Sequence, residues 1–177
     1  RFETLDYLAR IEIQAAGMKD FLSANGGGKK STWGTLGACR PSPLECELRD
    51  SIVKFAARLY RQRLVFTGNV VLSTRLGKED LLVTPAGFDP LALRIEDVVR
   101  VAGGSCEPGK TPACQTGLCA EIYRRNDWAN AVIMTRSPNV MAFACTGTPL
   151  DSRTIPESYI QLRDIPMISS REKTGPW

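Results

Sequence analysis

Short runs of branched aliphatic residues alternate with amphipathic segments from residue 42 onward, and this alternation constrains the fold more than any single motif. The runs 69–73, 80–84, 97–101 and 129–134 are bounded by glycine, proline or charge, which is typical of strands. Helices are predicted over 42–59, 116–125 and 138–145, with a further short helix after Ile155. Such alternation predicts a layered α/β/α domain around a central mixed or antiparallel sheet.

The first helix of this domain carries a clear start signal. Ser42 is placed to cap it, Pro43 fits the first helical position, and Glu45 completes a capping box. The residues predicted to form its buried face are Leu44, Leu48, Ile52, Phe55, Ala56 and Leu59. On the helix predicted over 116–125, Leu118 and Ile122 are expected to pack inward.

Four regions are expected along the chain. Residues 1–22 carry an apolar stripe at helical spacing and predict an amphipathic extension. The glycine-rich stretch 23–41 predicts a flexible tether, 42–170 the α/β domain and 171–177 a tail. A helix over residues 4–22 on such a tether either folds back on its own domain or docks on another protein.

Composition excludes several classes of protein. The chain of 177 residues has no apolar run near the ~20 residues that a membrane span requires. Its net charge of +4 is mild and its lysines and arginines are scattered, which does not favour a nucleic-acid partner. The six cysteines match no zinc-binding spacing, and we expect free thiols in a reducing compartment. Their nearest approach to a metal-binding cluster is Cys106, Cys114 and Cys119.

The chain contains no histidine. Imidazole is the usual general base near neutral pH and the commonest protein ligand for zinc, copper and non-haem iron. A Ser-His-Asp triad, a Cys-His dyad and a histidine-based metal site therefore cannot be built from these 177 residues alone.

The order and spacing of six segments resemble the class II aldolase/adducin head family, with members similar to L-fuculose-phosphate aldolase. The resemblance extends from about Asp50 to Ser170 and implies that family's α/β fold. The segments that carry it are Ala57 to Val65, Thr67 to Asn69, Leu82 to Gly87, Ile95 to Val99, Ala120 to Arg124 and Asn130 to Pro138.

This resemblance implies a zinc-dependent enzyme acting on sugar phosphates. In active members of the family, a His-Thr-His-Ser-Pro stretch and a later histidine hold the metal, and a Glu in a Pro-Ser-Ser-Glu stretch transfers the proton. The corresponding segments here are Met134-Thr135-Arg136-Ser137-Pro138 and Pro112-Ala113-Cys114-Gln115. No later histidine follows, and we expect the fold to lack the family's final strands, which another chain could supply.

The replacements disfavour the chemistry that the family implies. A thioether such as that of Met134 is a poor zinc ligand, and the guanidinium of Arg136 has no lone pair to donate. At about 4 Å that guanidinium would repel a divalent cation by roughly 8 kcal/mol for an effective dielectric constant of about 20. Gln115 keeps the shape of a glutamate but cannot take up a proton. No catalytic residue, metal or cofactor is therefore expected, and Gln115, Met134 and Arg136 are degenerate positions.

A remnant of the family's phosphate-binding turn is also present, at Gly68, Asn69, Thr84, Gly87 and Ser137. Aided by Arg136, these residues could form a residual anion pocket. The favoured alternative is that Gly and Asn persist because the turns need left-handed backbone angles.

The replacements predict a non-catalytic structural or interaction subunit derived from an aldolase, within a larger mitochondrial assembly such as a respiratory-chain complex or ribosome. Its partners would be other protein subunits, its location the matrix side of the mitochondrion or, alternatively, the cytoplasm. The alternative function is an enzyme of altered chemistry, or a sugar-phosphate or anion-binding module in the remnant pocket. The residues considered for altered chemistry are Cys114, Cys119, Asp89 and Glu121, with Cys114 as the best candidate nucleophile.

Overall fold

The computed structural model describes residues 33–37, 40–65 and 70–166. It divides into two compact units, one of residues 31–138 and one that includes residues 139–166. The predicted helix 4–22, the tail 171–177, most of the predicted tether 23–41 and the turn residues Gly68 and Asn69 lie outside the described residues. The predicted docking of helix 4–22 on protein subunits therefore stays a prediction.

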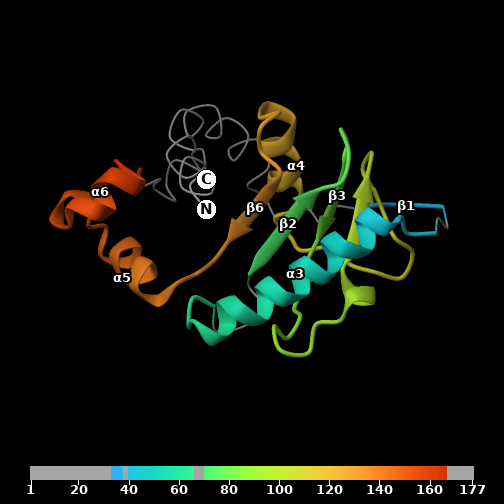
Figure 1. Cartoon of the computed structure of the whole chain (residues 1–177), viewed down its shortest axis with the longest axis horizontal. Coiled ribbons are helices and arrows are strands. Elements are labelled where there is room, and N and C mark those ends of the chain that lie inside the picture. Colours follow the sequence, from blue (N-terminus) through green and yellow to red (C-terminus); the bar gives the residue numbers. More distant parts are fainter. Residues whose placement is uncertain (1–32, 38–39, 66–69, 167–177) are drawn as a thin grey trace, which may run out of the picture. The chain divides into compact units, whose positions relative to one another are not determined.

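The larger unit holds a six-stranded mixed sheet in the order β1-β5-β4-β3-β2-β6 (Figure 1). The strand β1 runs parallel to β5, and the other neighbouring strands are antiparallel. This architecture confirms the predicted α/β class with a mixed sheet. The strands are β1 (Gly34–Thr35), β2 (Val71–Arg75), β3 (Asp80–Val83), β4 (Val99–Ala102), β5 (Ser105–Cys106) and β6 (Ala131–Met134).

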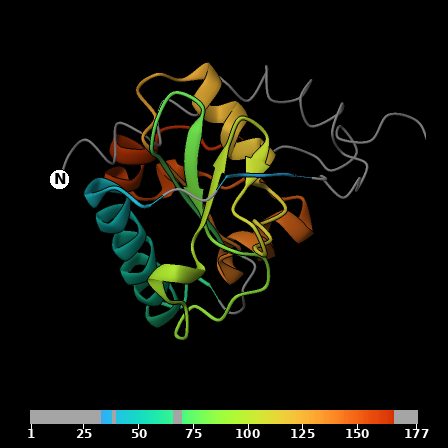
Figure 2. The same cartoon turned by 90° about the vertical axis from the view of Figure 1, so that its right-hand side faces the viewer.

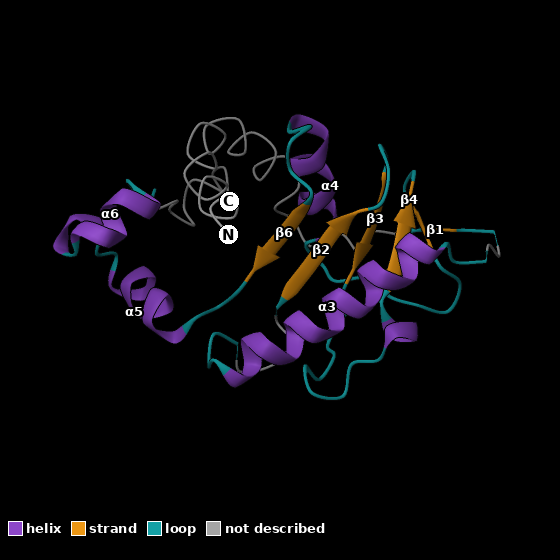
Figure 3. Cartoon of the chain, in the orientation of Figure 1, coloured by secondary structure: helices purple, strands orange, loops and turns teal. Residues whose placement is uncertain are grey.

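Two helices cover opposite faces of this sheet: α3 (Pro43–Arg61) and α4 (Thr116–Arg125) (Figures 2 and 3). Alternation along β2 explains the arrangement, because successive side chains point to opposite faces. Leu72 belongs to the core cluster that includes Ile52 of α3, whereas the neighbouring Ser73 accepts a hydrogen bond of 3.1 Å from the Tyr123 hydroxyl of α4.

The core between α3 and the sheet is built from the residues that the strand and helix patterns single out. Branched and aromatic side chains fill it, and burying each one stabilises the fold by about 1.5–3 kcal/mol. A short 3₁₀ helix, η1 (Ile95–Asp97), precedes β4 and closes one end. The buried members are Ile52, Ala56, Val65, Val70, Leu72, Leu82, Phe88, Leu93 and Val98.

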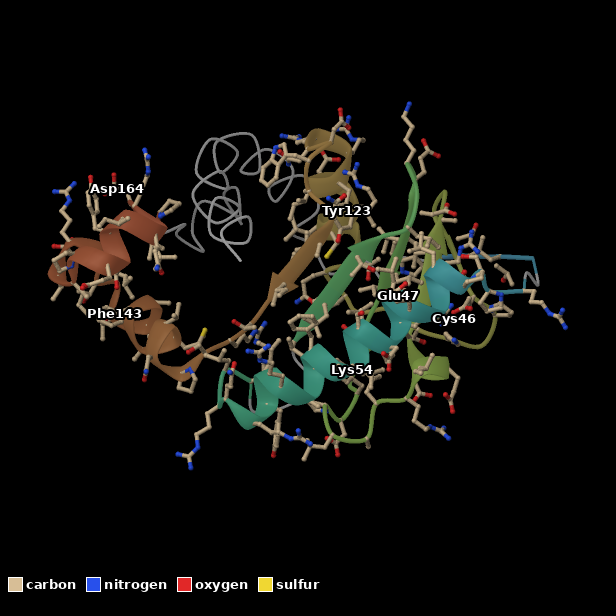
Figure 4. The ribbon with its side chains drawn as sticks, viewed as in Figure 1. Cys46, Glu47, Lys54, Tyr123, Phe143 and Asp164 are labelled. Carbon is tan, nitrogen blue, oxygen red and sulfur yellow. The ribbon has the colours of Figure 1, made fainter. Side chains whose placement is uncertain are left out.

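The structure corrects the predicted buried face of α3. Ser42 caps the helix as expected, since its Oγ accepts a hydrogen bond of 3.1 Å from the Glu45 amide. Leu44 and Phe55, however, are 55% and 49% exposed, while Glu45 and Arg49 are almost fully buried. The helix is turned so that its first two turns place this ion pair against the sheet. On the side of α3 away from the sheet lie Cys46, Glu47 and Lys54 (Figure 4).

Two strands were missed because each has only two residues and no periodic pattern. Within the predicted tether, β1 forms hydrogen bonds to the β5 hairpin, from Gly34 N to Gly104 O at 3.1 Å and from Leu36 N to Cys106 O at 2.8 Å. A Cβ at position 34 would lie 2.6 Å from Ser105 Oγ, so a larger residue there would force this hydroxyl to rotate away. In α4, the predicted inward residues Leu118 and Ile122 are half-buried, and Cys119 and Tyr123 are buried.

The described residues of the second unit form two helices and one 3₁₀ turn: α5 (Pro138–Thr146), which begins at the boundary, η2 (Ser152–Thr154) and α6 (Pro156–Leu162). The short helix predicted after Ile155 is thus present. Asp151 caps η2 by accepting from the Arg153 amide, and the Ser152 hydroxyl donates to the Arg163 carbonyl. In Figure 4, Phe143 lies on α5 and Asp164 just after α6. None of the helices within the described ranges is long and apolar enough to cross a membrane.

Candidate functional site

Three strand ends meet at one edge of the sheet, because β2 runs antiparallel to both of its neighbours. Val71, the first residue of β2, pairs with Met134, the last residue of β6. On the other side of β2, the amide of Thr84, just after β3, donates to the Leu72 carbonyl at 3.0 Å. Adjacent strands lie about 4.8 Å apart, so Thr84 and Met134 flank β2 at roughly twice that separation. We name the residues gathered here the site edge: 84–87, 112–115 and 134–137.

Thr84 connects the turn after β3 to the backbone of β2. It is fully buried, and its Oγ1 accepts a hydrogen bond of 3.3 Å from the Leu72 amide and donates to the Val70 carbonyl at 3.4 Å. Both contacts are to the backbone of β2, so the hydroxyl orders the turn. Three residues later, Gly87 has a φ of 67° with open space around it. These two residues fit a structural role in the turn, which is the alternative that the sequence favours.

The loop 112–115 is fastened to the turn after β3. Pro85 and Pro112 form an isolated antiparallel bridge, flanked by hydrogen bonds from Ala86 N to Thr111 O at 3.0 Å and from Ala113 N to Thr84 O at 3.1 Å. The loop thereby delivers its last two residues, Cys114 and Gln115, to the site edge.

Gln115 is half-buried and occupies the position before the first turn of α4. Cys114 is exposed, and its Sγ lies 2.9 Å from Gln115 Oε1, with the thiol donating. The predicted correspondence of these two residues to the family's acidic stretch puts a thiol and an amide where a carboxylate would act.

The segment after β6 supplies the third part of the site edge. Met134 is half-buried on the face of the sheet that α4 covers, since the preceding Ile133 is 51% exposed on the other face. Arg136 is exposed and forms no ion pair with another described residue, and Ser137 is half-buried. The structure therefore brings Gln115, Met134, Arg136, Ser137 and Thr84 to one edge, while Gly68 and Asn69 lie outside the described residues.

Of the residues considered for altered chemistry, two are unsuited to it. Burial raises the pKa of the Cys119 thiol to about 12, so this thiol stays protonated and is a poor nucleophile. Hydrogen bonds from Arg124, and then from Arg125, hold the pKa of Glu121 at about 2 and keep its carboxylate in ion pairs on α4. Cys114 remains at the site edge, and Asp89 lies beyond the turn.

Asp89 lines a cavity of about 460 Å³ next to the turn after β3. Its Oδ1 accepts from the Leu91 amide at 2.9 Å. Lys110 also lines the cavity, but its Nζ donates to the Val98 carbonyl at 3.0 Å and to Glu107 at 2.9 Å. Asp89 and Lys110 thus form hydrogen bonds within the surrounding loops, and the two side chains are not paired with each other as an acid and a base in this cavity.

The sequence patterns gave no sign of the charged network beneath the first turns of α3. Arg49 lies 2.6 Å from Glu45 and 2.7 Å from Glu107, and Arg100 links Glu45 to Asp80. Burial raises the pKa of Glu107, but hydrogen bonds from Lys110, the Arg100 amide and Arg49 outweigh this and leave it below its ordinary value. The spacing of Glu45 and Arg49 indicates a helical pair, yet their burial depends on partners far away in the sequence.

The described cysteines 46, 106, 114, 119 and 145 are free thiols. Among the residues that the structure places, no three His, Cys, Asp or Glu side chains are grouped as a metal site. Cys106 is buried and donates to the Lys110 carbonyl at 3.6 Å, whereas Cys114 is exposed at the site edge.

Residues 50–175 match the Class II Aldolase and Adducin N-terminal domain. The chain belongs to this family. Solved structures share the fold of this chain: the YgbL protein of Escherichia coli has a TM-score of 0.64 at 21% identity, covering 73% of this chain and 68% of YgbL. An L-fuculose 1-phosphate aldolase has a TM-score of 0.56 at 21% identity, with coverages of 64% and 54%.

Sequence relatives of the chain are enzymes by name. The methylthioribulose-1-phosphate dehydratase of Pseudomonas fluorescens (strain Pf0-1) is 32% identical over 94 residues, which is 52% of this chain and 41% of the relative. The enzyme of the same name from Pectobacterium carotovorum (strain PC1) is 37% identical over 70 residues, 38% of this chain and 34% of the relative. The matched segments thus span less than half of either relative.

These relatives overturn part of the sequence-based interpretation. The prediction of a non-catalytic structural subunit of a mitochondrial assembly is wrong, because proteins 31–38% identical to the chain are bacterial enzymes. That prediction rested on the absence of the family's metal-binding histidines. The enzyme alternative agrees better with the relatives.

The residues of the site edge do not fit the zinc ion that the family resemblance implies. Zinc prefers imidazole, thiolate and carboxylate ligands. The corresponding positions supply the thioether of Met134, the guanidinium of Arg136 and the amide of Gln115, which are respectively soft, cationic and neutral.

Proposed function

We propose that the chain is an enzyme that removes water from a small phosphorylated ketose, using chemistry altered from that of its metal-dependent kin. The support is the similarity to proteins named methylthioribulose-1-phosphate dehydratase, together with a family match that contains the whole site edge. The cytoplasmic alternative goes with this proposal, since the named relatives are bacterial enzymes.

Dehydration of a ketose needs three groups. A base removes the proton from the carbon next to the carbonyl, and a donor stabilises the enolate oxygen. An acid protonates the hydroxyl on the following carbon, which leaves as water. The resulting enol becomes a second ketone, so the product is a dicarbonyl compound. An additional contact must hold the phosphate.

The site edge offers candidates for two of these roles. The Gln115 amide is half-buried beside α4 and can donate its N–H groups to the enolate oxygen, but it cannot exchange a proton. Cys114 is the titratable side chain next to it, 2.9 Å from Gln115 Oε1. We assign proton transfer to Cys114 and orientation of the carbonyl to Gln115. The single observation that carries this assignment is their contact at the start of α4, on a loop hydrogen-bonded to Thr84.

The test uses the purified chain and methylthioribulose-1-phosphate, with the dicarbonyl product trapped by o-phenylenediamine and identified by mass spectrometry. Turnover is expected, and Cys114→Ser is expected to lower kcat by roughly 10²–10⁴-fold, the usual contribution of a positioned acid or base. Cys46→Ser, which removes another exposed thiol on α3, is the matched control and should leave kcat unchanged. Absence of turnover by the unaltered chain would contradict the proposal.

A further inference from the structure

We propose that the site edge works without a bound metal ion, and that the guanidinium of Arg136 binds the anionic oxygens of the ligand in its place. The inference rests on the proposed function only for the kind of ligand, a phosphorylated sugar. Its two components, rejection of zinc and binding of phosphate, are measurable without turnover.

The first argument is the donor set that the fold brings together. The register of β6 with β2 fixes Met134 opposite Val71, and the Pro85–Pro112 bridge fixes the loop that ends in Gln115. These positions contribute a thioether and an amide, and Cys114 contributes a thiol that donates to the amide oxygen. Zn²⁺ is instead bound by imidazole, thiolate or carboxylate groups. Mg²⁺ takes oxygen ligands, chiefly carboxylates and water.

The second argument is the charge of the site edge. Its three segments read Thr-Pro-Ala-Gly, Pro-Ala-Cys-Gln and Met-Thr-Arg-Ser, so they include one cation and no carboxylate. A site with this charge attracts anions and repels divalent cations. The cation is a guanidinium, which has hydrogen-bond donors for an anion and no lone pair for a metal ion.

The third argument is that Arg136 is available, whereas other arginines of this unit are used by the fold. Arg49 is held by two glutamates, and Arg75 by the carbonyls of α4 and the loop that follows it. Arg136 is exposed, two residues beyond the end of β6, and forms no ion pair with another residue in the described part of the chain. Its planar fork of donors matches two phosphate oxygens at once.

Neutral donors lie on the same edge as this cation. Ser137 follows it directly and is half-buried, and Gln115 lies at the start of α4 on the same edge. A charged donor with two neutral donors is a usual composition for a phosphate or enolate site. Negative charge that develops on the ligand would then be stabilised by the side chain of Arg136, where related enzymes use a bound metal ion.

The first experiment measures metal content. The full chain is incubated with excess ZnCl₂, dialysed, and analysed by inductively coupled plasma mass spectrometry. Substoichiometric zinc is expected. One tightly held zinc per chain would overturn the proposal.

The second experiment measures the affinity for inorganic phosphate by isothermal titration calorimetry, with and without EDTA. The affinity is expected to be unaffected by EDTA, to fall about tenfold or more in Arg136→Gln, and to be partly retained in Arg136→Lys. Arg58→Gln changes the net charge equally on the exposed side of α3 and should bind phosphate as the unaltered chain does.

Equal phosphate affinities for Arg136→Gln and the unaltered chain, no measurable phosphate binding, or loss of binding in EDTA would each overturn the inference. Circular dichroism verifies that the variants are folded. If phosphate binds through Arg136 but the ketose is not converted, the dehydratase proposal fails while this inference stands. The two proposals are thus separately testable.

Discussion

Replacing Arg49 by methionine tests how far the buried network beneath α3 stabilises the larger unit. Arg49 is 3% exposed and lies 2.6 Å from Glu45 and 2.7 Å from Glu107, with a further hydrogen bond to the Val98 carbonyl. Methionine keeps most of the volume of the side chain and removes its charge. Glu45, 2% exposed, is then left in the core as an anion with one partner fewer.

The size of the effect follows from what the remaining groups can do. Breaking a buried pair by removing one partner usually costs about 3–5 kcal/mol. Here Arg100 still contacts Glu45 at 3.2 Å, while Lys110 still contacts Glu107 at 2.9 Å and the Val98 carbonyl at 3.0 Å. We therefore expect the lower end, about 3 kcal/mol, which is roughly a hundredfold change in the folding equilibrium.

Urea unfolding followed by far-UV circular dichroism measures this change, together with a thermal midpoint that should fall by roughly 6–12 °C. Lys54→Met on the same helix is the matched control. It breaks an ion pair of 2.5 Å with Asp50, but Lys54 is 74% exposed, so the loss should stay below about 0.5 kcal/mol. If Arg49→Met were no more destabilising than Lys54→Met, the network would not be the stabilising element described above.

Three further outcomes are expected. Tyr123→Phe removes the buried hydrogen bond to Ser73 and should lower the free energy of unfolding by about 1 kcal/mol in urea, an effect that disappears in a Ser73→Ala background. The pKa of Glu121 is lowered from 4.5 to about 2, so its ion pairs stabilise the fold above pH 4.5 and this contribution is lost as the pH falls toward about 2. In Glu121→Gln, the free energy of unfolding should therefore depend less on pH across that window, and an unchanged pH dependence would contradict the assignment. Iodoacetamide at pH 8 should alkylate Cys114 in the native chain and spare Cys119 until denaturant is added, as peptide mass spectrometry would reveal.

The sequence predicted the main elements because their signals are local. The capped start at Ser42, the helix 116–125 and the aliphatic runs of β2, β3, β4 and β6 depend on neighbours within a few residues. The strands β1 and β5 lack such a signal, since two residues cannot display a period. The sequence also could not predict that Phe55 is exposed while Arg49 is buried. The pattern of a helix does not show which of its sides faces charged residues that lie far away in the sequence, here on β4 and after β5.

The candidate site was predictable in part. The correspondence of Gln115, Met134 and Arg136 to a catalytic motif came from their order along the chain. They meet because β6 pairs with β2, and because the Pro85–Pro112 bridge holds the loop 112–115 to the turn after β3. Their function was not predictable in this way. A missing residue type excludes particular mechanisms, such as imidazole-mediated proton transfer, but it does not exclude activity through the thiol of Cys114 or the guanidinium of Arg136.

The bridge of Pro85 with Pro112 has a consequence for how the site edge opens. Proline has no amide hydrogen, so the paired residues themselves contribute no hydrogen bond, and the loop is joined at this point by the amides of Ala86 and Ala113 alone. Separating this loop from the turn after β3 would therefore break two backbone hydrogen bonds and expose the buried Ala113, whereas separating β2 from β3 would break a longer ladder. Deuterium uptake at the amides of those two alanines would report separation of the loop from the turn, before the rest of the sheet exchanges.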